Sequence, residues 1–358
     1  MDEDMKKRLI CLLLALCLLL CPLLLTSCQG RLKKFTKYSL DYFDTATTII
    51  GYARDQQEFD RICADILSGL EEYHRLYTIY HRYEGLENLC TINERVGGAH
   101  RTVEVDRRII DLLIYAKQMY ALTDGKINIA MGSMLSIWHD YREQGMSSPQ
   151  LAALPDMQEL SAAAEHTEID KIIIDEHAST VTLADPAMTL DVGAIAKGYA
   201  VEMLAKELQE KGITGYLINV GGNVRTIGPK ADGQPWTIGI ENPQDDEATP
   251  HLALLALSDY SLVTSGSYQR FYMVNGQRYH HIISQETLMP ARGYQSVSVV
   301  CPNSGMADAL STALFCMTLE QGQRLVESLA SVEAMWVKED GTIYESSGFS
   351  AFCTTLAS

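Results

Sequence analysis

The sequence predicts an α+β fold, with mixed antiparallel sheets and long packing helices. Two kinds of pattern lead to this prediction. Helical periodicity is clear over residues 59–80 and 106–122, so long helices are expected there. Strand-like runs flank Asn275 and Gly276, a dipeptide typical of a tight hairpin turn. Antiparallel hairpins combined with long helices favour this class over a doubly wound parallel sheet.

In the first half of the chain, strand and helix patterns alternate. β-Branched residues predict a strand over residues 38–52, and the two long helices follow it. The second of these helices is expected to end at Thr123-Asp124-Gly125. Further elements in this half are short helices over 133–141 and 157–164 and paired strands over 171–175 and 180–184.

The second half begins with a helix over residues 193–211, which Gly212 stops, and continues with a buried strand over 215–220. Strands are expected over 236–241, 252–258, 261–264 and 295–301, together with the hairpin formed by 271–274 and 277–283. The last predicted elements are helices over 306–317 and 321–330 and two hairpin strands around Asp340-Gly341.

The N-terminal segment has the layout of an export signal. A basic stretch at residues 6–8 precedes an apolar run of 17 residues, 9–25, and Cys28 follows directly after a Thr-Ser pair. This order is typical of a bacterial lipoprotein signal peptide at residues 1–27, cleaved before a lipidated Cys28. The alternative is an uncleaved membrane anchor, for which this run is at the short limit. Both interpretations place the rest of the chain outside the cytoplasm, at a membrane of the bacterial cell envelope.

The mature chain is expected to consist of a short tether, residues 28–37, and a single domain, residues 38–358. The five cysteines after Cys28 are Cys63, Cys90, Cys301, Cys316 and Cys353. Their odd number, their scatter and the lack of a CxxC pair argue against a disulfide framework and against a zinc site. The net charge of −17 argues against nucleic-acid binding, and a substrate that carries phosphates would need a cation.

An acid and a hydroxyl, Asp308 and Thr312, stand four residues apart in a small and apolar run. In a helix they lie one above the other on the same face. Two hard oxygen ligands on one face would make half of a Mg²⁺ site, because Mg²⁺ prefers oxygen and takes few protein carboxylates. The alternative is that Asp308 caps the helix and Thr312 bonds back to a carbonyl.

Two glycine-containing segments could bring backbone close to a ligand. In the first, Asp191 precedes Gly193 and Ala194 at a helix start, where exposed N–H groups favour an anion and Lys197 adds charge. A plain helix cap with an exposed lysine is the alternative. In the second, the paired glycines 221–222 follow a hydrophobic strand, which marks either a ligand contact or a tight turn.

Two adjacent histidines, His280 and His281, lie in the predicted hairpin strand. Strand alternation puts their side chains on opposite faces, so only one can face a given site. A histidine in a cleft can act as a general base near neutral pH. The alternative is an ordinary strand histidine.

Five collinear segments resemble the ApbE-like family, the FAD:protein FMN transferases. These segments are DVGAIAKGYAVE (191–202), INVGGNVRTIG (218–228), VTSGSYQRFY (263–272), RYHHII (278–283) and ADALSTALF (307–315). The resemblance implies an ApbE-like, T-fold-like architecture. It also implies Mg²⁺-dependent transfer of FMN from FAD to a threonine or serine of an extracytoplasmic flavoprotein, through a phosphoester, with release of AMP.

The resemblance assigns roles residue by residue. It implies a metal site formed by the side chains of Asp308 and Thr312 and the backbone carbonyl of Ala194. It implies FAD contacts at Tyr80, Ala130, Met131, Gly132, Asp191, Lys197 and the backbone near Ile283. It favours His281 over His280 as the base that removes the acceptor proton.

The sequence departs from the family pattern directly after the histidines. Ser284 and Gln285 stand where the family usually has an aspartate and a proline. Another acid such as Glu286 could take over from the lost carboxylate. The alternatives to the transferase are a Mg²⁺-dependent FAD pyrophosphatase that yields FMN and AMP, a non-catalytic flavin-binding lipoprotein, and a purely structural envelope lipoprotein.

Overall fold

The computed structural model describes residues 32–98, 101–244, 246 and 248–356. The predicted signal peptide, residues 1–27, and the predicted lipidation site Cys28 lie outside the described residues. Within the ranges described, no helix is long and apolar enough to cross a membrane.

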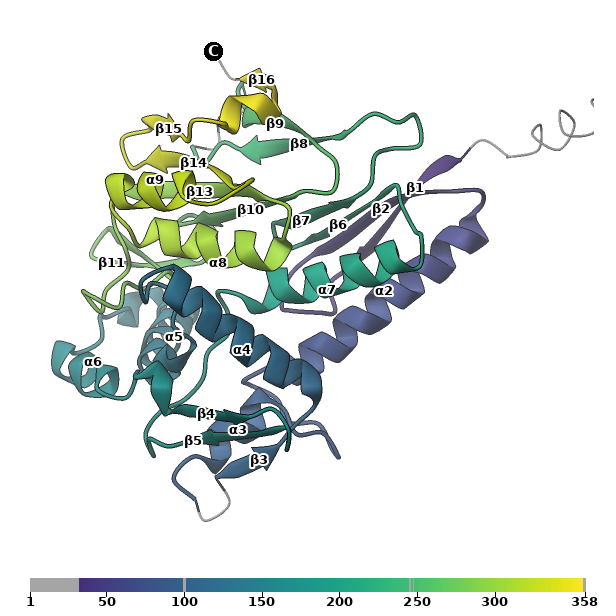
Figure 1. Cartoon of the computed structure of the whole chain (residues 1–358). Coiled ribbons are helices and arrows are strands. Elements are labelled where there is room, and N and C mark those ends of the chain that lie inside the picture. The colour runs from purple at the N-terminus through teal and green to yellow at the C-terminus, as the bar shows by residue number, and fades with distance from the viewer. Residues whose placement is uncertain (1–31, 99–100, 245, 247, 357–358) are drawn as a thin grey trace, which may run out of the picture.

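An eight-stranded antiparallel sheet forms the centre of the molecule (Figure 1). Its strands, in spatial order, are β1 (Lys33–Ser39), β2 (Thr47–Ala53), β6 (Tyr216–Val220), β7 (Asn223–Ile227), β10 (Ser261–Gly266), β13 (Tyr294–Cys301), β14 (Glu333–Lys338) and β15 (Ile343–Glu345). Each neighbouring pair is antiparallel. Segments from both ends of the chain therefore meet in one sheet, and the pairing of β7 with β10 brings two of the sequence motifs side by side.

Helices cover one face of this sheet and bury the main hydrophobic core against it. They are α2 (Gln56–Tyr77), α7 (Ala196–Glu210) and α8 (Ser304–Phe315), with α4 (Arg107–Leu122) and α9 (Leu319–Glu327) beside them (Figure 1). In α2, apolar residues recur every three or four positions, from Phe59 to Leu76, and all face the core. Asp55 caps the start of α2 by accepting the N–H of Glu58.

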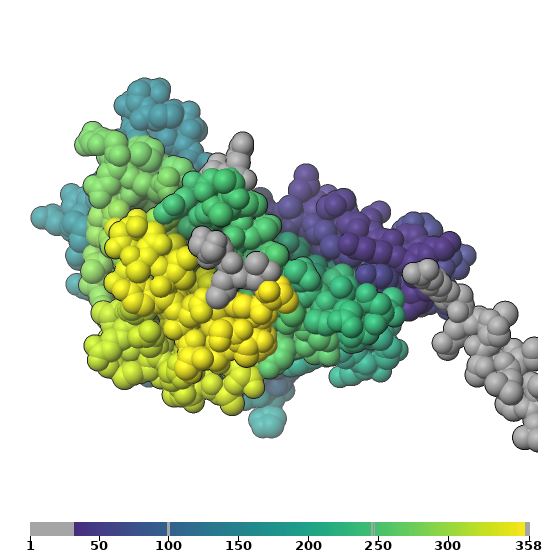
Figure 2. All heavy atoms as spheres, turned by 90° about the horizontal axis from the view of Figure 1, so that it is seen from above, coloured from purple at the N-terminus to yellow at the C-terminus, as the bar shows by residue number. Residues whose placement is uncertain are grey.

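A second layer covers the opposite face of the sheet. It is a three-stranded sheet in the order β16 (Cys353–Leu356), β9 (His251–Leu257) and β8 (Trp236–Glu241). Seen from above, the yellow C-terminal segment and the green strands form one continuous surface (Figure 2). Trp236, Leu255 and Phe349 are buried between this layer and the central sheet, where they meet Val300 and Met335.

The remaining elements form two groups, one below α4 and one to its left in Figure 1. The strands β3 (Thr102–Glu104), β5 (Thr180–Leu183) and β4 (Ile172–Asp175) form a small sheet beside α3 (Leu89–Arg95). The helices α5 (Gly132–Ser147) and α6 (Met157–Ala164) pack with the hairpin β11 (Phe271–Val274) and β12 (Gln277–His280). This last group has its own apolar cluster around Trp138 and Tyr279, and it forms one wall of the cleft described below.

The structure confirms the α+β class with mixed antiparallel sheets, and it corrects the start of the fold. Residues 38–52, expected to be one strand, are parts of two strands separated by a loop. Residues 33–37, expected to belong to a flexible tether, pair in β1 with β2, from Lys33 opposite Ala53 onward. The strand pattern was hidden because β1 is an edge strand with mostly exposed side chains, three of them lysines.

Helix boundaries shift by a few residues, and two shifts concern the site. The helix expected from residue 193 begins at Ala196, so 193–195 form a turn before α7. The helix expected from residue 306 begins at Ser304, because Asn303 caps it by accepting the N–H of Met306. The elements α3, β3, β7 and β16 were not predicted from the sequence.

Candidate functional site

A cleft of about 540 Å³ lies where the turn before α7, the middle of α8, the end of β10 and the helix α5 meet. Nine of the residues assigned by the resemblance line it: Tyr80, Met131, Asp191, Ala194, Lys197, His281, Ile283, Asp308 and Thr312. These residues are up to 232 positions apart in the sequence, from Tyr80 to Thr312, and the fold brings them to one place.

Asp308 lies on α8 and faces α7. Its side chain is 4% exposed. One carboxylate oxygen accepts the backbone N–H of Gly198 at 2.8 Å, and the other accepts the Asn223 amide at 3.4 Å. Burial raises the pKa of Asp308, while Lys197 and the two hydrogen bonds act in the opposite direction. The carboxylate therefore lies in a place where a bound cation would stabilise its charge.

Thr312 lies one turn further along α8, on the same side as Asp308. Its hydroxyl is 3.2 Å from the hydroxyl of Ser265 at the end of β10. The same Ser265 hydroxyl is 2.8 Å from that of Ser311. These contacts hold the Thr312 oxygen at the cleft wall, on the same side of the helix as Asp308, as the helical spacing predicts. The alternative that Asp308 caps the helix is wrong, because the capping residue is Asn303.

The turn that leads into α7 supplies the opposite wall. Asp191 accepts the N–H of Gly193 at 2.8 Å, which shapes the turn, and burial raises the pKa of its carboxyl. Ala194 follows, half-buried, and lines the cleft. The ammonium of Lys197 donates to the Gly193 carbonyl at 3.3 Å, so its charge lies near this turn.

The donor set suits Mg²⁺. The Asp308 carboxylate and the Thr312 hydroxyl belong to residues that line one cleft together with Ala194, whose backbone carbonyl would be a third hard oxygen donor. The buried Asn223 side-chain oxygen beside Asp308 has no hydrogen-bond partner. Among the residues described, no cluster of three or more His, Cys, Asp or Glu is arranged to hold a metal.

The two histidines point in opposite directions, as strand alternation predicts. His280 is buried against Phe315; its ring accepts the N–H of Ile282 and donates to the Ala291 carbonyl at 2.8 Å. His281 lines the cleft instead, half-buried, with Nδ1 3.3 Å from the Arg270 carbonyl. Burial, and next the Arg270 guanidinium, lower the pKa of His281 to about 3, so its ring is neutral at pH 7.

The structure separates the three residues 130–132. Met131 lines the cleft, whereas Ala130 and Gly132 lie behind the wall and do not reach it. Gly132 is fixed by packing: its N–H donates to the Thr189 carbonyl at 3.0 Å, and a Cβ there would be 2.5 Å from that oxygen. Of the three residues expected to contact FAD, only Met131 therefore borders the cleft.

The paired glycines form a tight turn, one of the two roles considered for them. Gly221 and Gly222 form the two-residue turn between β6 and β7, with φ of 56° and 91°, which glycine adopts without strain. Gly221 also lines the cleft, close against Thr45. The turn places Asn223 beside Asp308.

Sequence reasoning missed several cations of the cleft. Lys126, Arg142 and Arg270 line it together with Lys197, although the whole chain has a net charge of −17. Arg142 also contacts His139, at 2.9 Å, and His139 packs against the ring of Tyr80. Four cations in one cleft of an acidic protein suit an anionic ligand. Arg270 lies in a motif quoted above, but no local pattern identified the others.

The loop after His281 is tied to the segment that precedes α5. Gln285 accepts a hydrogen bond from Asn128 at 3.2 Å, and Glu286 forms an ion pair with Lys126. Ser284 is buried, and its N–H donates to the Met289 carbonyl. The side chain of Gln285 and the backbone of Ser284 thus anchor this loop, and Glu286 faces Lys126 rather than His281.

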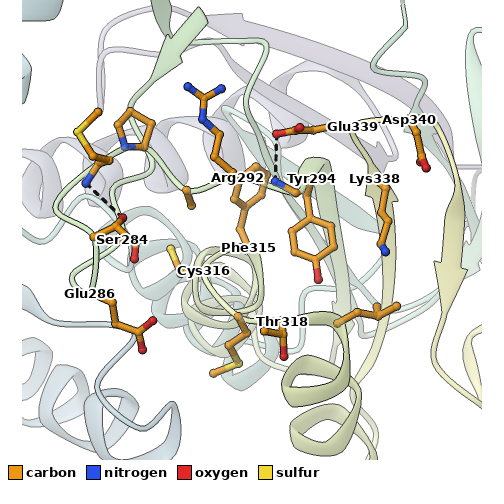
Figure 3. A pocket seen from close by; sticks show the side chains of 17 residues that line it. Ser284, Glu286, Arg292, Tyr294, Phe315, Cys316, Thr318, Lys338, Glu339 and Asp340 are labelled. Carbon is orange, nitrogen blue, oxygen red and sulfur yellow. Dashed lines mark hydrogen bonds between the residues drawn. The ribbon is translucent and has the colours of Figure 1, made fainter. Parts of the chain in front are cut away.

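A second cavity of about 830 Å³ lies behind this loop, between the end of α8 and the turn after β14 (Figure 3). Ser284, Phe315 and Cys316 line it on one side and Lys338 to Asp340 on the other. Of the residues assigned by the resemblance, none is in its lining. The residues that the resemblance assigns gather in the first cleft instead.

The fold and the cleft together define a class: an antiparallel α+β protein with a cleft that is lined by both cationic side chains and hard oxygen donors. The sequence model of the ApbE family matches residues 38–336. The chain belongs to the ApbE family.

Relatives and solved structures agree with this membership. The chain is 31% identical to a FAD:protein FMN transferase of Klebsiella pneumoniae, over 76% of this chain and 84% of the relative. It is 30% identical to a FAD:protein FMN transferase of Treponema pallidum, over 90% of both chains. The crystal structure of the ApbE protein from Thermotoga maritima superposes with a TM-score of 0.78 at 28% identity, over 89% of this chain and 99% of that one.

Proposed function

We propose that this protein is a Mg²⁺-dependent FAD:protein FMN transferase. It would transfer FMN from FAD to a threonine or serine of an extracytoplasmic flavoprotein and release AMP. The observation that carries the proposal is the cleft itself, where Asp308, Thr312 and Ala194 lie together with four cations. Membership of a family whose relatives are FAD:protein FMN transferases supports the same reaction.

Asp308, Thr312 and the Ala194 carbonyl would hold the metal. When bound, Mg²⁺ would neutralise charge on the pyrophosphate of FAD. Lys197 lies at the same wall and adds a fixed positive charge. Asp191, Tyr80, Met131 and the backbone near Ile283 would orient the dinucleotide in the cleft.

His281 would take the proton of the acceptor hydroxyl. Its Nδ1–H donates to the Arg270 carbonyl, which leaves Nε2 free to accept a proton. The acceptor oxygen forms a bond to the FMN-side phosphorus, the bond from this phosphorus to the bridging oxygen breaks, and AMP leaves with that oxygen. The ring is already neutral at pH 7, because burial holds the pKa of His281 low.

The proposed location is the outer side of a bacterial membrane, with the chain anchored by a lipid on Cys28. The support is the sequence layout of residues 1–28. The proposed acceptor would then be a flavoprotein on the same side of the membrane.

One incubation distinguishes the transferase from its alternatives. The purified protein is mixed with FAD, MgCl₂ and a flavoprotein that carries an acceptor threonine, and the flavoprotein is weighed by mass spectrometry. We expect a gain of one FMN less one water. Free FMN and AMP without this gain would indicate the pyrophosphatase, and intact bound FAD would indicate a flavin-binding lipoprotein.

The matched variants are Asp308→Ala and Asp308→Asn. We expect both to abolish transfer at any practical Mg²⁺ concentration, because neither offers the metal a carboxylate. Asp308→Asn keeps the side-chain shape and serves as the control for folding, measured by circular dichroism. An unchanged transfer rate in either folded variant would remove the metal assignment.

A further inference from the structure

The helices α7 and α8 contact each other through side chains and backbone at regular steps of four residues. Asp308 of α8 accepts the N–H of Gly198 of α7. One turn along, the Glu202 carboxylate of α7 accepts the N–H of Ser304 of α8 at 2.8 Å. As the residue number rises by four on α7, it falls by four on α8, so the two helices run antiparallel here.

The next step of four leads to the proposed metal site. Ala194 lies four residues before Gly198, and Thr312 lies four residues after Asp308. Both line the same cleft. The pairs Glu202–Ser304 (the inner level) and Gly198–Asp308 (the middle level) are therefore consecutive levels of the α7–α8 interface. The proposed Mg²⁺ site lies beyond them, between Thr312 on α8 and Ala194 in the turn just before α7.

Glu202 is an unusual residue for the inner level, because a carboxylate is rarely buried without a partner. Its side chain is 4% exposed, as is that of Arg225, whose guanidinium donates to the same carboxylate oxygen at 3.1 Å. Arg225 lies on β7, two residues after Asn223, which donates to Asp308. The buried pair thus connects α7, α8 and the strand that supports the metal ligand.

The middle level leaves no room for adjustment. A Cβ on Gly198 would be 2.4 Å from the Asp308 Cβ and 2.4 Å from the Ser304 carbonyl oxygen. The helices are in backbone contact at this point, so a shift of α8 along α7 would move Asp308 and Thr312 together. The Glu202 carboxylate accepts a backbone N–H in the first turn of α8 and therefore opposes such a shift. Its negative charge also interacts favourably with the positive, N-terminal end of the α8 dipole.

We propose that Glu202 is a positioning residue for the metal site: by holding the N–H of Ser304, it sets the register of α8 on α7 and hence the spacing of Asp308 and Thr312 from Ala194. Arg225 supplies the countercharge that lets Glu202 be buried. This inference rests on the proposed function, since it assumes the metal site, but it assigns residues that touch neither metal nor substrate.

The test measures metal affinity separately from stability. Mn²⁺, a paramagnetic substitute for Mg²⁺, is titrated into the full-length protein with saturating FAD, and free Mn²⁺ is followed by electron paramagnetic resonance. Melting temperatures are measured by circular dichroism. The main variant is Glu202→Leu with Arg225→Met, which removes both buried charges at once, a change that often leaves stability unharmed.

We expect the double variant to melt near the temperature of the unchanged protein and to bind Mn²⁺ about tenfold more weakly, as is typical for loss of a residue that orients a metal ligand. Glu202→Gln should give the opposite result. Its amide oxygen still accepts the Ser304 N–H, so Mn²⁺ affinity stays within about twofold, while the unpaired Arg225 lowers the melting temperature.

Glu333→Gln is the matched control. The Glu333 carboxylate also accepts a backbone N–H, that of Gly348 at 3.0 Å, but on β14, away from the cleft. It should melt earlier with unchanged Mn²⁺ affinity. A folded double variant that binds Mn²⁺ like the unchanged protein, or a Glu202→Gln variant that loses as much affinity as the double variant, overturns the inference. If the unchanged protein itself binds no Mn²⁺, the proposed function fails first.

Discussion

At the scale of single residues, the cleft contains two groups whose burial shifts the pKa toward the neutral form. Burial raises the pKa of the Asp308 carboxyl. Burial also lowers the pKa of the His281 imidazole, so that this ring is neutral near pH 7. Shifted pKa values of this kind are common at sites that bind a metal or transfer a proton. They suit the two different roles proposed for His281 and Asp308, proton acceptor and metal ligand, although both residues line the same cleft.

His281→Ala should separate binding from chemistry. The cleft keeps Lys197, Asp191 and the metal ligands, so FAD affinity measured by calorimetry should stay close to that of the unchanged protein. The transfer rate should fall by about 10²–10⁴-fold, the usual contribution of a positioned general base. Equal loss of FAD affinity and rate would make His281 a binding residue instead.

Arg270→Gln should move the pH dependence of transfer in a known direction. The Arg270 charge disfavours protonation of His281, so its removal raises the pKa of His281 from about 3. A base is inactive when protonated, and the acid limb of kcat/KM against pH should therefore move to higher pH. Log kcat/KM is measured from pH 2.5 to 9, so that an acid limb near the pKa of about 3 lies inside the range; a limb that stays in place or moves to lower pH contradicts the role of His281.

At the scale of elements, the site depends on how closely α7 approaches α8. Gly198→Ala should push the helices apart, because the new Cβ would meet Asp308 and the Ser304 carbonyl. The free energy of unfolding should fall by about 1–3 kcal/mol, the usual effect of overpacking a core, and more Mg²⁺ should be needed for transfer. Chemical denaturation and a MgCl₂ series measure the two effects.

Gly305→Ala is the control for that substitution. Gly305 is also on α8, but a Cβ there would come no nearer than 3.2 Å to its neighbours. We expect a smaller loss of stability and an unchanged Mg²⁺ requirement. Equal effects of both substitutions would show that the close approach at Gly198 has no special part in the site.

The elements also show what the sequence could and could not predict. Local periodicity placed Asp308 and Thr312 on one helix face, and strand alternation separated His280 from His281, because both depend on neighbours in the chain. The edge strand β1 was missed, since backbone pairing with β2 holds it and its side chains are mostly exposed. The contact of Glu202 with Ser304 spans 102 positions, and no local pattern encodes it.

At the scale of the whole molecule, an acidic protein concentrates cations in one cleft. The net charge is −17, yet Lys126, Arg142, Lys197 and Arg270 all line the cavity. Asp44, Asp191 and Asp308 line the cleft as well, so the four cations offset these carboxylates and make the cleft less negative than the chain as a whole, which favours an anionic ligand there over the rest of the surface. The same acidity argues against nucleic acid as a partner.

Cys28→Ser tests the proposed anchor. A lipoprotein loses its lipid with this cysteine, so the variant should leave the membrane fraction or remain as an unprocessed precursor, while its transfer activity in detergent stays unchanged. Fractionation and the mass of the mature N-terminus provide the measurement. A variant that stays in the membrane with the same N-terminus as the unchanged protein would instead support an uncleaved anchor.

The central claim is that a divalent ion held by Asp308, Thr312 and the Ala194 carbonyl binds the pyrophosphate of FAD. A crystal of the protein grown with FAD and Mn²⁺, with diffraction data collected near the manganese absorption edge, tests it most directly. The account predicts an anomalous peak bounded by these three oxygens and by phosphate oxygens of the flavin dinucleotide. FAD bound elsewhere, or bound in this cleft with no anomalous peak beside Asp308, would contradict it.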